Sequence, residues 1–137
     1  MERIRESICD LAASRRRVYV GLQGQYRKMA GLYAEISSGA AVLSIDYRLA
    51  PEHPFPAALE DAVAAYKWLR EKGYESERII VVGDSAGGGL AMALCMELRT
   101  NGEPMPVGLV AMSPWTDLAI TGESYTMNRE IDPVFGA

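Results

Sequence analysis

The chain has 137 residues, of which 49% are hydrophobic and 23% charged, and its formal net charge is −4. These values fit one globular domain with a real core, and the charge gives no basis for nucleic-acid binding. A run of about 18 apolar residues is absent, which excludes a membrane-spanning helix, and the charged N-terminus lacks the apolar stretch of an export signal. We therefore expect a cytoplasmic protein, in which Cys9 and Cys95 form neither a disulfide framework nor a metal site.

Hydrophobic spacing predicts alternating helices and strands along most of the chain. An apolar helix directly after residue 87 is expected at the centre of the core, because it is apolar nearly all round. Glycines at 21 and 24 are expected to cut the first strand short, and the tail beyond residue 116 is polar with weak periodicity. The predicted elements are a helix over 3–14, a strand at 18–20, a helix over 26–37, a strand over 40–46, a helix over 56–72, a strand over 79–82, a helix over 88–99 and a strand over 107–112.

This order predicts an α/β fold with a parallel sheet and right-handed crossovers. In such sheets the ligand lies outside the carboxyl ends of the strands. The loops that follow Asp46, Gly83 and Ser113 should all emerge at that edge, where one site could gather them.

The turn Gly83-Asp84-Ser85-Ala86-Gly87 has the pattern G-x-S-x-G between a buried strand and an apolar helix. In this setting a serine stands on a strained elbow with its hydroxyl exposed above the sheet. The glycines are expected because a side chain at either position would clash in so tight a turn. The backbone N–H of the residue after the serine can donate to a developing oxyanion.

Two other interpretations of this turn stay open. It could be a glycine-rich connection with an incidental serine, because G-x-S-x-G alone often arises by chance. A phosphate-binding loop is the weaker alternative, because the chain lacks a G-K-[ST] sequence.

Three motifs together resemble the hormone-sensitive-lipase-like branch of the α/β-hydrolases. They are the stretch 46–61 (DYRLAPEHPFPAALED), the stretch 83–88 (GDSAGG) and the stretch 113–118 (SPWTDL). The resemblance implies a carboxylesterase for small or short-acyl esters, without a metal or an organic cofactor. It implies Ser85 as the nucleophile, Ala86 as one oxyanion donor, and an elbow that includes Gly83, Asp84, Gly87 and Gly88. Residues 1–137 would then form a single, incomplete α/β-hydrolase domain with a partial parallel sheet, truncated at both ends.

The chain departs from this family where the rest of the catalytic machinery is expected. The family's HGGG oxyanion loop would fall near residues 15–18, where the sequence reads RRRV. The acid and the histidine of the triad should follow the serine, but Asp117 and Asp132 are interpreted as turn residues. The single histidine, His53, precedes the serine in a proline-rich loop and is interpreted as structural.

These departures leave three hypotheses. The first is an esterase-like chain that is impaired or inactive in isolation. The second is a non-catalytic α/β module that binds a ligand or a partner and keeps a relic serine. The third is a homo-oligomer that supplies a missing strand, because residues 18–20 look like a poor replacement for the strand that bears the HGGG loop.

Overall fold

The computed structural model describes residues 18–22, 27–37 and 40–133 of the chain. Strands and helices alternate along these residues, as the hydrophobic spacing predicts. The elements are β1 (Val18–Leu22), α1 (Arg27–Ile36), β2 (Ala41–Ile45), α2 (Ala57–Glu71), the 3-10 turn η3 (Ser76–Arg78), β3 (Ile79–Asp84), α3 (Ala86–Thr100), β4 (Gly108–Met112) and α4 (Glu123–Met127). The predicted helix over 3–14, with Cys9, lies outside the described residues.

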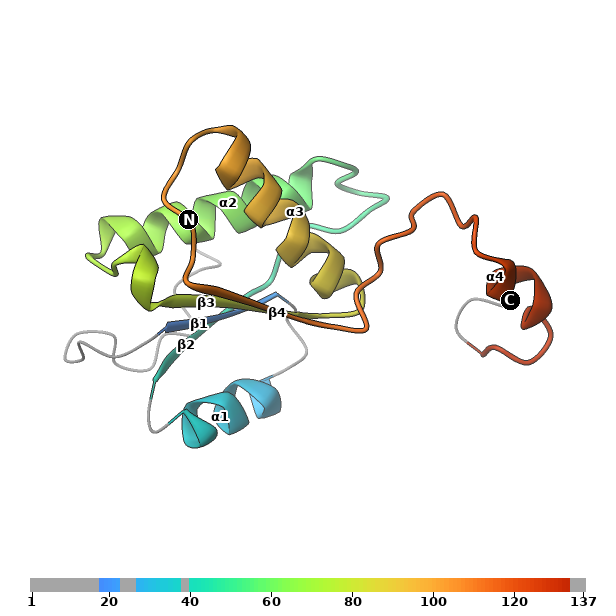
Figure 1. Cartoon of the computed structure of the whole chain (residues 1–137), viewed down its shortest axis with the longest axis horizontal. Coiled ribbons are helices and arrows are strands. Elements are labelled where there is room, and N and C mark those ends of the chain that lie inside the picture. Colours follow the sequence, from blue (N-terminus) through green and yellow to red (C-terminus); the bar gives the residue numbers. More distant parts are fainter. Residues whose placement is uncertain (1–17, 23–26, 38–39, 134–137) are drawn as a thin grey trace.

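The four strands form one sheet in the order β2-β1-β3-β4, and all neighbours are parallel. Helices α2 and α3 cover one face of the sheet, and α1 lies on the other (Figure 1). The strand ends after residues 83 and 111 are paired in register, so the loops that follow β3 and β4 leave the sheet at the same edge. The predicted α/β fold with a parallel sheet is therefore confirmed.

Strand β1 corrects one expectation about this sheet. It runs from Val18 through Gly21 to Leu22, and it lies between β2 and β3 with ladder partners on both sides. Glycine weakens a strand interior but keeps its N–H and C=O, so pairing on two sides can hold it in place. The prediction that residues 18–20 are a poor replacement for this strand is wrong, because β1 pairs with β2 and with β3. The homo-oligomer stays a prediction, but this strand position does not require it.

The same strand moves the expected position of the oxyanion loop. Because Val18 begins β1, residues 15–18 cannot form the turn that follows this strand. The connection from β1 to α1 is residues 23–26, which lie outside the described residues. The position deduced by counting back from the serine was therefore wrong by several residues.

The main core lies between the sheet and the helices α2 and α3. Side chains from two strands and both helices have almost no solvent exposure, and they form one contiguous cluster. The cluster contains Leu43, Ile45, Ala62, Ala65, Tyr66, Leu69, Ile79, Val81, Ala91, Leu94 and Leu98. This packing fixes β3 against α3 and so determines the angle of the turn between them.

Two elements whose apolar runs predict burial have exposed apolar faces. On α3, Leu94 is buried, but Met96 is 68% exposed. On β4, Leu109 and Val110 are 39% and 46% exposed, because this strand is at the edge of the sheet. An apolar run identifies a strand or helix that can be covered, but it does not say whether a neighbour covers it.

Candidate active site

Ser85 lies directly between the end of β3 and the start of α3, as the sequence predicts. Its backbone has φ 52° and ψ −120°, outside the helical and strand regions. A non-glycine residue in so sparsely populated a conformation costs about 1–3 kcal/mol and persists only where the surroundings enforce it. The Ser85 side chain makes no capping hydrogen bond to α3. Its hydroxyl is therefore not used to satisfy the helix terminus.

Gly83 and Gly88, on either side of Ser85, are required by close backbone contacts. A Cβ atom on Gly83 would lie 2.1 Å from the carbonyl oxygen of Gly87, so the first turn of α3 sits directly over the end of β3. A Cβ atom on Gly88 would lie 3.0 Å from Cα of Pro114. The predicted steric reason for Gly83 is thus visible in the structure, and Gly88 has a separate role against the loop after β4.

Ala86 is the first residue of α3 and is exposed. Backbone N–H groups in the first turn of a helix have no partner within the helix, and the helix dipole makes them favourable for negative charge. The position of Ala86 is therefore suited to donate a hydrogen bond to an anion above Ser85.

The end of β4 and the segment after it hold the main chain of Ser85. The N–H of Ser85 donates to the carbonyl oxygen of Met112 at 2.9 Å. The carbonyl oxygen of Ser85 accepts from Gly89 N–H at 3.1 Å and from Trp115 N–H at 2.9 Å. The loops after β3 and β4 are thus brought together, as predicted. The SPWTDL motif that begins at Ser113 was noticed in the sequence, but its contact with the serine was not predicted.

The loop after β2 is anchored to α2 by Arg48. The backbone N–H of Arg48 donates to Asp61 Oδ2 at 2.8 Å, and its Nε lies 3.0 Å from both carboxylate oxygens of Asp61. One guanidinium nitrogen also contacts Glu60 at 3.0 Å. Burial alone would raise the pKa of Asp61, but the hydrogen bonds and the charge of Arg48 outweigh it, and the pKa lies below its ordinary value. These contacts give the stretch 46–61 a structural role.

His53 is exposed, and its backbone N–H donates to the carbonyl oxygen of Leu49 at 2.8 Å. Among the described residues, no hydrogen bond joins His53 to Ser85. This placement agrees with the interpretation of His53 as part of a structural loop.

Asp117 is a turn residue, as predicted. Its Oδ2 accepts from the backbone N–H of Thr121 at 2.7 Å, from the Thr121 hydroxyl at 3.0 Å and from Gly122 N–H at 3.1 Å. The bond from the Thr121 backbone is the main cause that lowers the pKa of Asp117. An acid committed to three donors of its own turn is poorly placed to orient a histidine.

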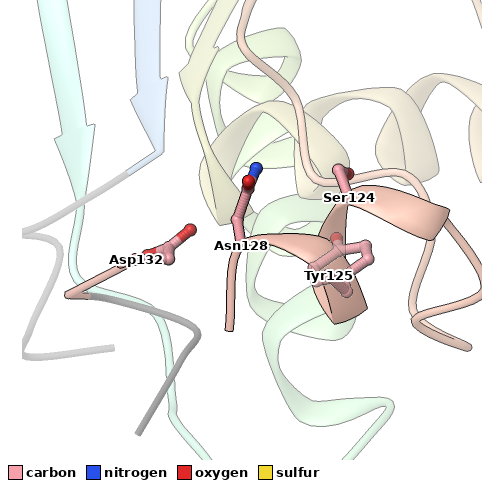
Figure 2. A pocket seen from close by; sticks show the side chains of 4 residues that line it. All are labelled: Ser124, Tyr125, Asn128 and Asp132. Atoms are coloured by element: carbon pink, nitrogen blue, oxygen red, sulfur yellow. The ribbon is translucent and has the colours of Figure 1, made fainter. Parts of the chain in front are cut away.

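Asp132 also lies in a turn, where its N–H donates to the carbonyl oxygen of Asn128 at 2.8 Å. It lines a hollow of about 230 Å³ with Ser124, Tyr125 and Asn128 (Figure 2). This hollow belongs to α4 and the turn after it, and α4 stands apart from the sheet (Figure 1). Asp132 therefore joins a separate surface feature rather than the serine turn.

Within residues 18–22, 27–37 and 40–133, no group of three His, Cys, Asp or Glu side chains could hold a metal ion. The helices of this part of the chain are all too short or too polar to cross a membrane. Cys95 is half-buried, and burial raises the pKa of its thiol, which disfavours the reactive thiolate.

A parallel α/β sheet in which a strained serine turn links a strand to a helix is the arrangement of the α/β-hydrolases. A family model described as alpha/beta hydrolase fold matches residues 23–135. The chain belongs to this family, within its hormone-sensitive-lipase-like branch. The resemblance inferred from the three motifs is therefore confirmed.

Named relatives agree with this assignment. An acetyl-hydrolase of Streptomyces hygroscopicus is 53% identical over 93 residues, which cover 68% of this chain and 31% of that protein. A crystal structure of an esterase from the bacterial hormone-sensitive lipase family has 47% identity and a TM-score of 0.73, covering 85% of this chain and 42% of the other. A structure of the esterase EstE5 soaked with p-nitrophenyl butyrate has 35% identity and a TM-score of 0.79, covering 99% and 54%. The chain thus spans about a third of the length of the curated relatives it matches.

Proposed function

We propose that this chain carries the nucleophile of a serine carboxylesterase, with Ser85 as the nucleophile and Ala86 N–H as an oxyanion donor. The observation that carries the proposal is the backbone of Ser85, which has φ 52° at the junction of β3 and α3. A strained serine whose hydroxyl does not cap the following helix is costly in a merely structural turn, and it is what a nucleophile elbow needs.

In the proposed reaction, the Ser85 oxygen attacks the carbonyl carbon of an ester and loses its proton to a base. The carbonyl oxygen gains negative charge, which the N–H of Ala86 stabilises with the dipole of α3. The bond to the alcohol then breaks, and the alcohol leaves with a proton. Water later hydrolyses the acyl-serine and restores the hydroxyl.

The proposed substrates are small or short-acyl esters. The support comes from the names of similar proteins, which include an acetyl-hydrolase and several esterases, and from the EstE5 structure soaked with p-nitrophenyl butyrate. Neither a metal nor an organic cofactor has a part in the proposed chemistry, because the serine route uses only proton transfers and an oxyanion site.

We further propose that the 137-residue chain alone turns over esters weakly or not at all. A serine hydroxyl is a poor nucleophile without an adjacent base. Among the described residues, no hydrogen bond connects Ser85 to a histidine, and Asp117 is committed to its own turn. The residual reactivity would come from the strained turn and from the Ala86 N–H.

The test is labelling with a fluorophosphonate probe, in which the Ser85 oxygen bonds to phosphorus, fluoride leaves and the hydroxyl proton goes to solvent. The expected result is slow labelling of the peptide that contains Ser85, and no labelling of this peptide in Ser85→Ala. Hydrolysis of p-nitrophenyl acetate measured on the same two proteins reports turnover. Fast hydrolysis that Ser85→Ala abolishes would refute the proposed weakness of the isolated chain.

The second candidate is a non-catalytic α/β module that binds a ligand or a partner and retains a relic serine. The observation in its favour is the lack of a base that contacts Ser85 among the described residues. A folded chain in which the probe never labels Ser85 would support this candidate against the esterase.

A further inference from the structure

The main chain of Ser85 is held by residues that lie outside the G-x-S-x-G pattern. Both peptide groups of Ser85 bond to the segment that ends β4: its N–H to Met112 O and its C=O to Trp115 N–H, each at 2.9 Å. Because Asp84 and Met112 are ladder partners, these contacts continue the pairing of β3 and β4 beyond the sheet. Figure 1 shows how the chain after β4 leaves the sheet beside the start of α3.

Gly89 shows how closely this segment approaches α3. A Cβ atom on Gly89 would lie 2.3 Å from the carbonyl oxygen of Trp115 and 3.3 Å from its carbonyl carbon. Gly89 is helical and has no left-handed φ, so its glycine is required by this approach rather than by its own conformation. Gly31 in α1 provides the contrast, because a Cβ atom there would meet nothing within 4 Å.

The far end of the segment is also anchored. The indole Nε1 of Trp115 donates to the carbonyl oxygen of Asp117 at 3.1 Å. The carboxylate of Asp117 in turn accepts from the backbone N–H groups of Thr121 and Gly122. Trp115 is therefore held between α3 on one side and the Asp117 turn on the other.

We propose that the segment Ser113–Asp117 is a clamp that positions the nucleophile, with Gly89 and Trp115 as its positioning residues. The clamp holds the C=O of Ser85 through Trp115 N–H, while Met112 at the end of β4 holds its N–H, and together these bonds maintain the strained backbone of Ser85. Without the bond from Trp115, the carbonyl of Ser85 keeps only its helical partner, Gly89 N–H. The clamp rests on the main-chain geometry, and its effect on reactivity rests on the proposed function.

The experiment compares Gly89→Ala with the matched control Gly31→Ala in the 137-residue chain. Both substitutions replace a helical glycine by alanine, but only the new methyl group of Gly89→Ala would meet a backbone atom. Two quantities are measured: the rate at which a fluorophosphonate labels Ser85, and the hydrogen-exchange protection of the Trp115 and Ser85 amides by NMR. The amides of Ile80, Val81 and Val82 report whether β3 remains intact.

We expect Gly89→Ala to slow the labelling of Ser85 at least tenfold and to reduce the protection of the Trp115 amide at least tenfold. The amides of β3 should keep their protection, and Gly31→Ala should lower neither the labelling rate nor the protection of the Trp115 amide. If Gly89→Ala does not fold, Gly88→Ala tests the same segment, because its Cβ atom would press on Pro114 at 3.0 Å. We expect a smaller loss in that variant, in the same two measurements.

Unchanged labelling and unchanged Trp115 protection in the folded variants would overturn the clamp. So would a Trp115 amide that exchanges freely in the wild type. If the wild-type serine is never labelled, the proposed function fails, and the exchange measurement alone decides whether the clamp exists. The two proposals can therefore fail separately.

Discussion

Tyr66 of α2 provides a test of the core that supports the serine turn. Its side chain is 1% exposed, and its hydroxyl donates to the carbonyl oxygen of Pro104 at 2.6 Å. Burial raises the pKa of Tyr66 to about 12 from an ordinary value of 10.0. Substitution of Tyr66 by phenylalanine removes both the hydrogen bond and the ionisation, and it keeps the ring in place.

The size of the effect depends on pH. At pH 8 the variant should lose about 1 kcal/mol, the typical net contribution of one hydrogen bond, because Pro104 is exposed and its carbonyl can bind water instead. A pKa raised in the folded chain means that folding favours the neutral hydroxyl. The stability that the folded chain gains from the neutral Tyr66 hydroxyl is fully present below pH 10, and it is lost as the pH rises towards 12. The shift of the pKa from 10 to about 12 lowers the free energy of unfolding by about 1.4 kcal/mol at pH 11. The loss reaches about 2.7 kcal/mol once the hydroxyl is ionised in both the folded and the unfolded chain.

The assay is urea denaturation, followed by circular dichroism, of wild type and Tyr66→Phe at pH 8 and pH 11. Other ionisations, including that of Tyr74, whose pKa burial also raises, occur in both proteins and cancel in the difference. We expect the wild type to be the more stable protein at pH 8 and to lose that advantage by pH 11. A constant difference between the two proteins across this range would refute the reasoning.

Four further substitutions test other parts of the structure, with the free energy of unfolding at pH 7 as the measured quantity and a pH series for Asp61→Asn. Gly83→Ala should destabilise by about 2 kcal/mol or more through its clash with α3, whereas Gly31→Ala should stabilise by about 0.5–1 kcal/mol; equal effects would contradict the steric argument. Asp61→Asn should cost about 1 kcal/mol, and because the pKa of Asp61 is lowered, the difference from wild type should vanish as the pH falls below 3.8. Leu94→Ala should cost about 2–5 kcal/mol as a core truncation, and a loss below 1 kcal/mol would count against the described core.

The elements of this chain were predictable because local sequence carries most of the information they need. The strand at 79–84 and the helix from 86 lie within a few residues of the predicted ranges, since apolar runs and glycine turns act over short distances. The short helix α4 was not predicted in the polar tail, where weak periodicity gives no signal. The length of β1 and its position inside the sheet were not predicted, because β1 is held by pairing with β2 and β3, which are distant in sequence.

The residues of the candidate site also differ in how far the local sequence predicts them. Ser85 and the glycines beside it were identified from a five-residue pattern, because the constraints of a tight turn are local. The roles of Gly89 and Trp115 were not identified, because their contact joins a helix to a loop 26 residues later in the chain. A glycine without a left-handed φ gives no local reason for its presence, and only packing explains it.

The sequence by itself determined the α/β class, the order of the elements, the family and the position of the serine turn. These follow from hydrophobic periodicity and from motifs whose chemistry is contained within a few residues. The tertiary structure alone decided that β1 occupies the centre of the sheet, that β4 and one face of α3 remain exposed, and that the segment after β4 holds Ser85. Each of these depends on contacts between residues far apart in the chain, which local patterns do not encode.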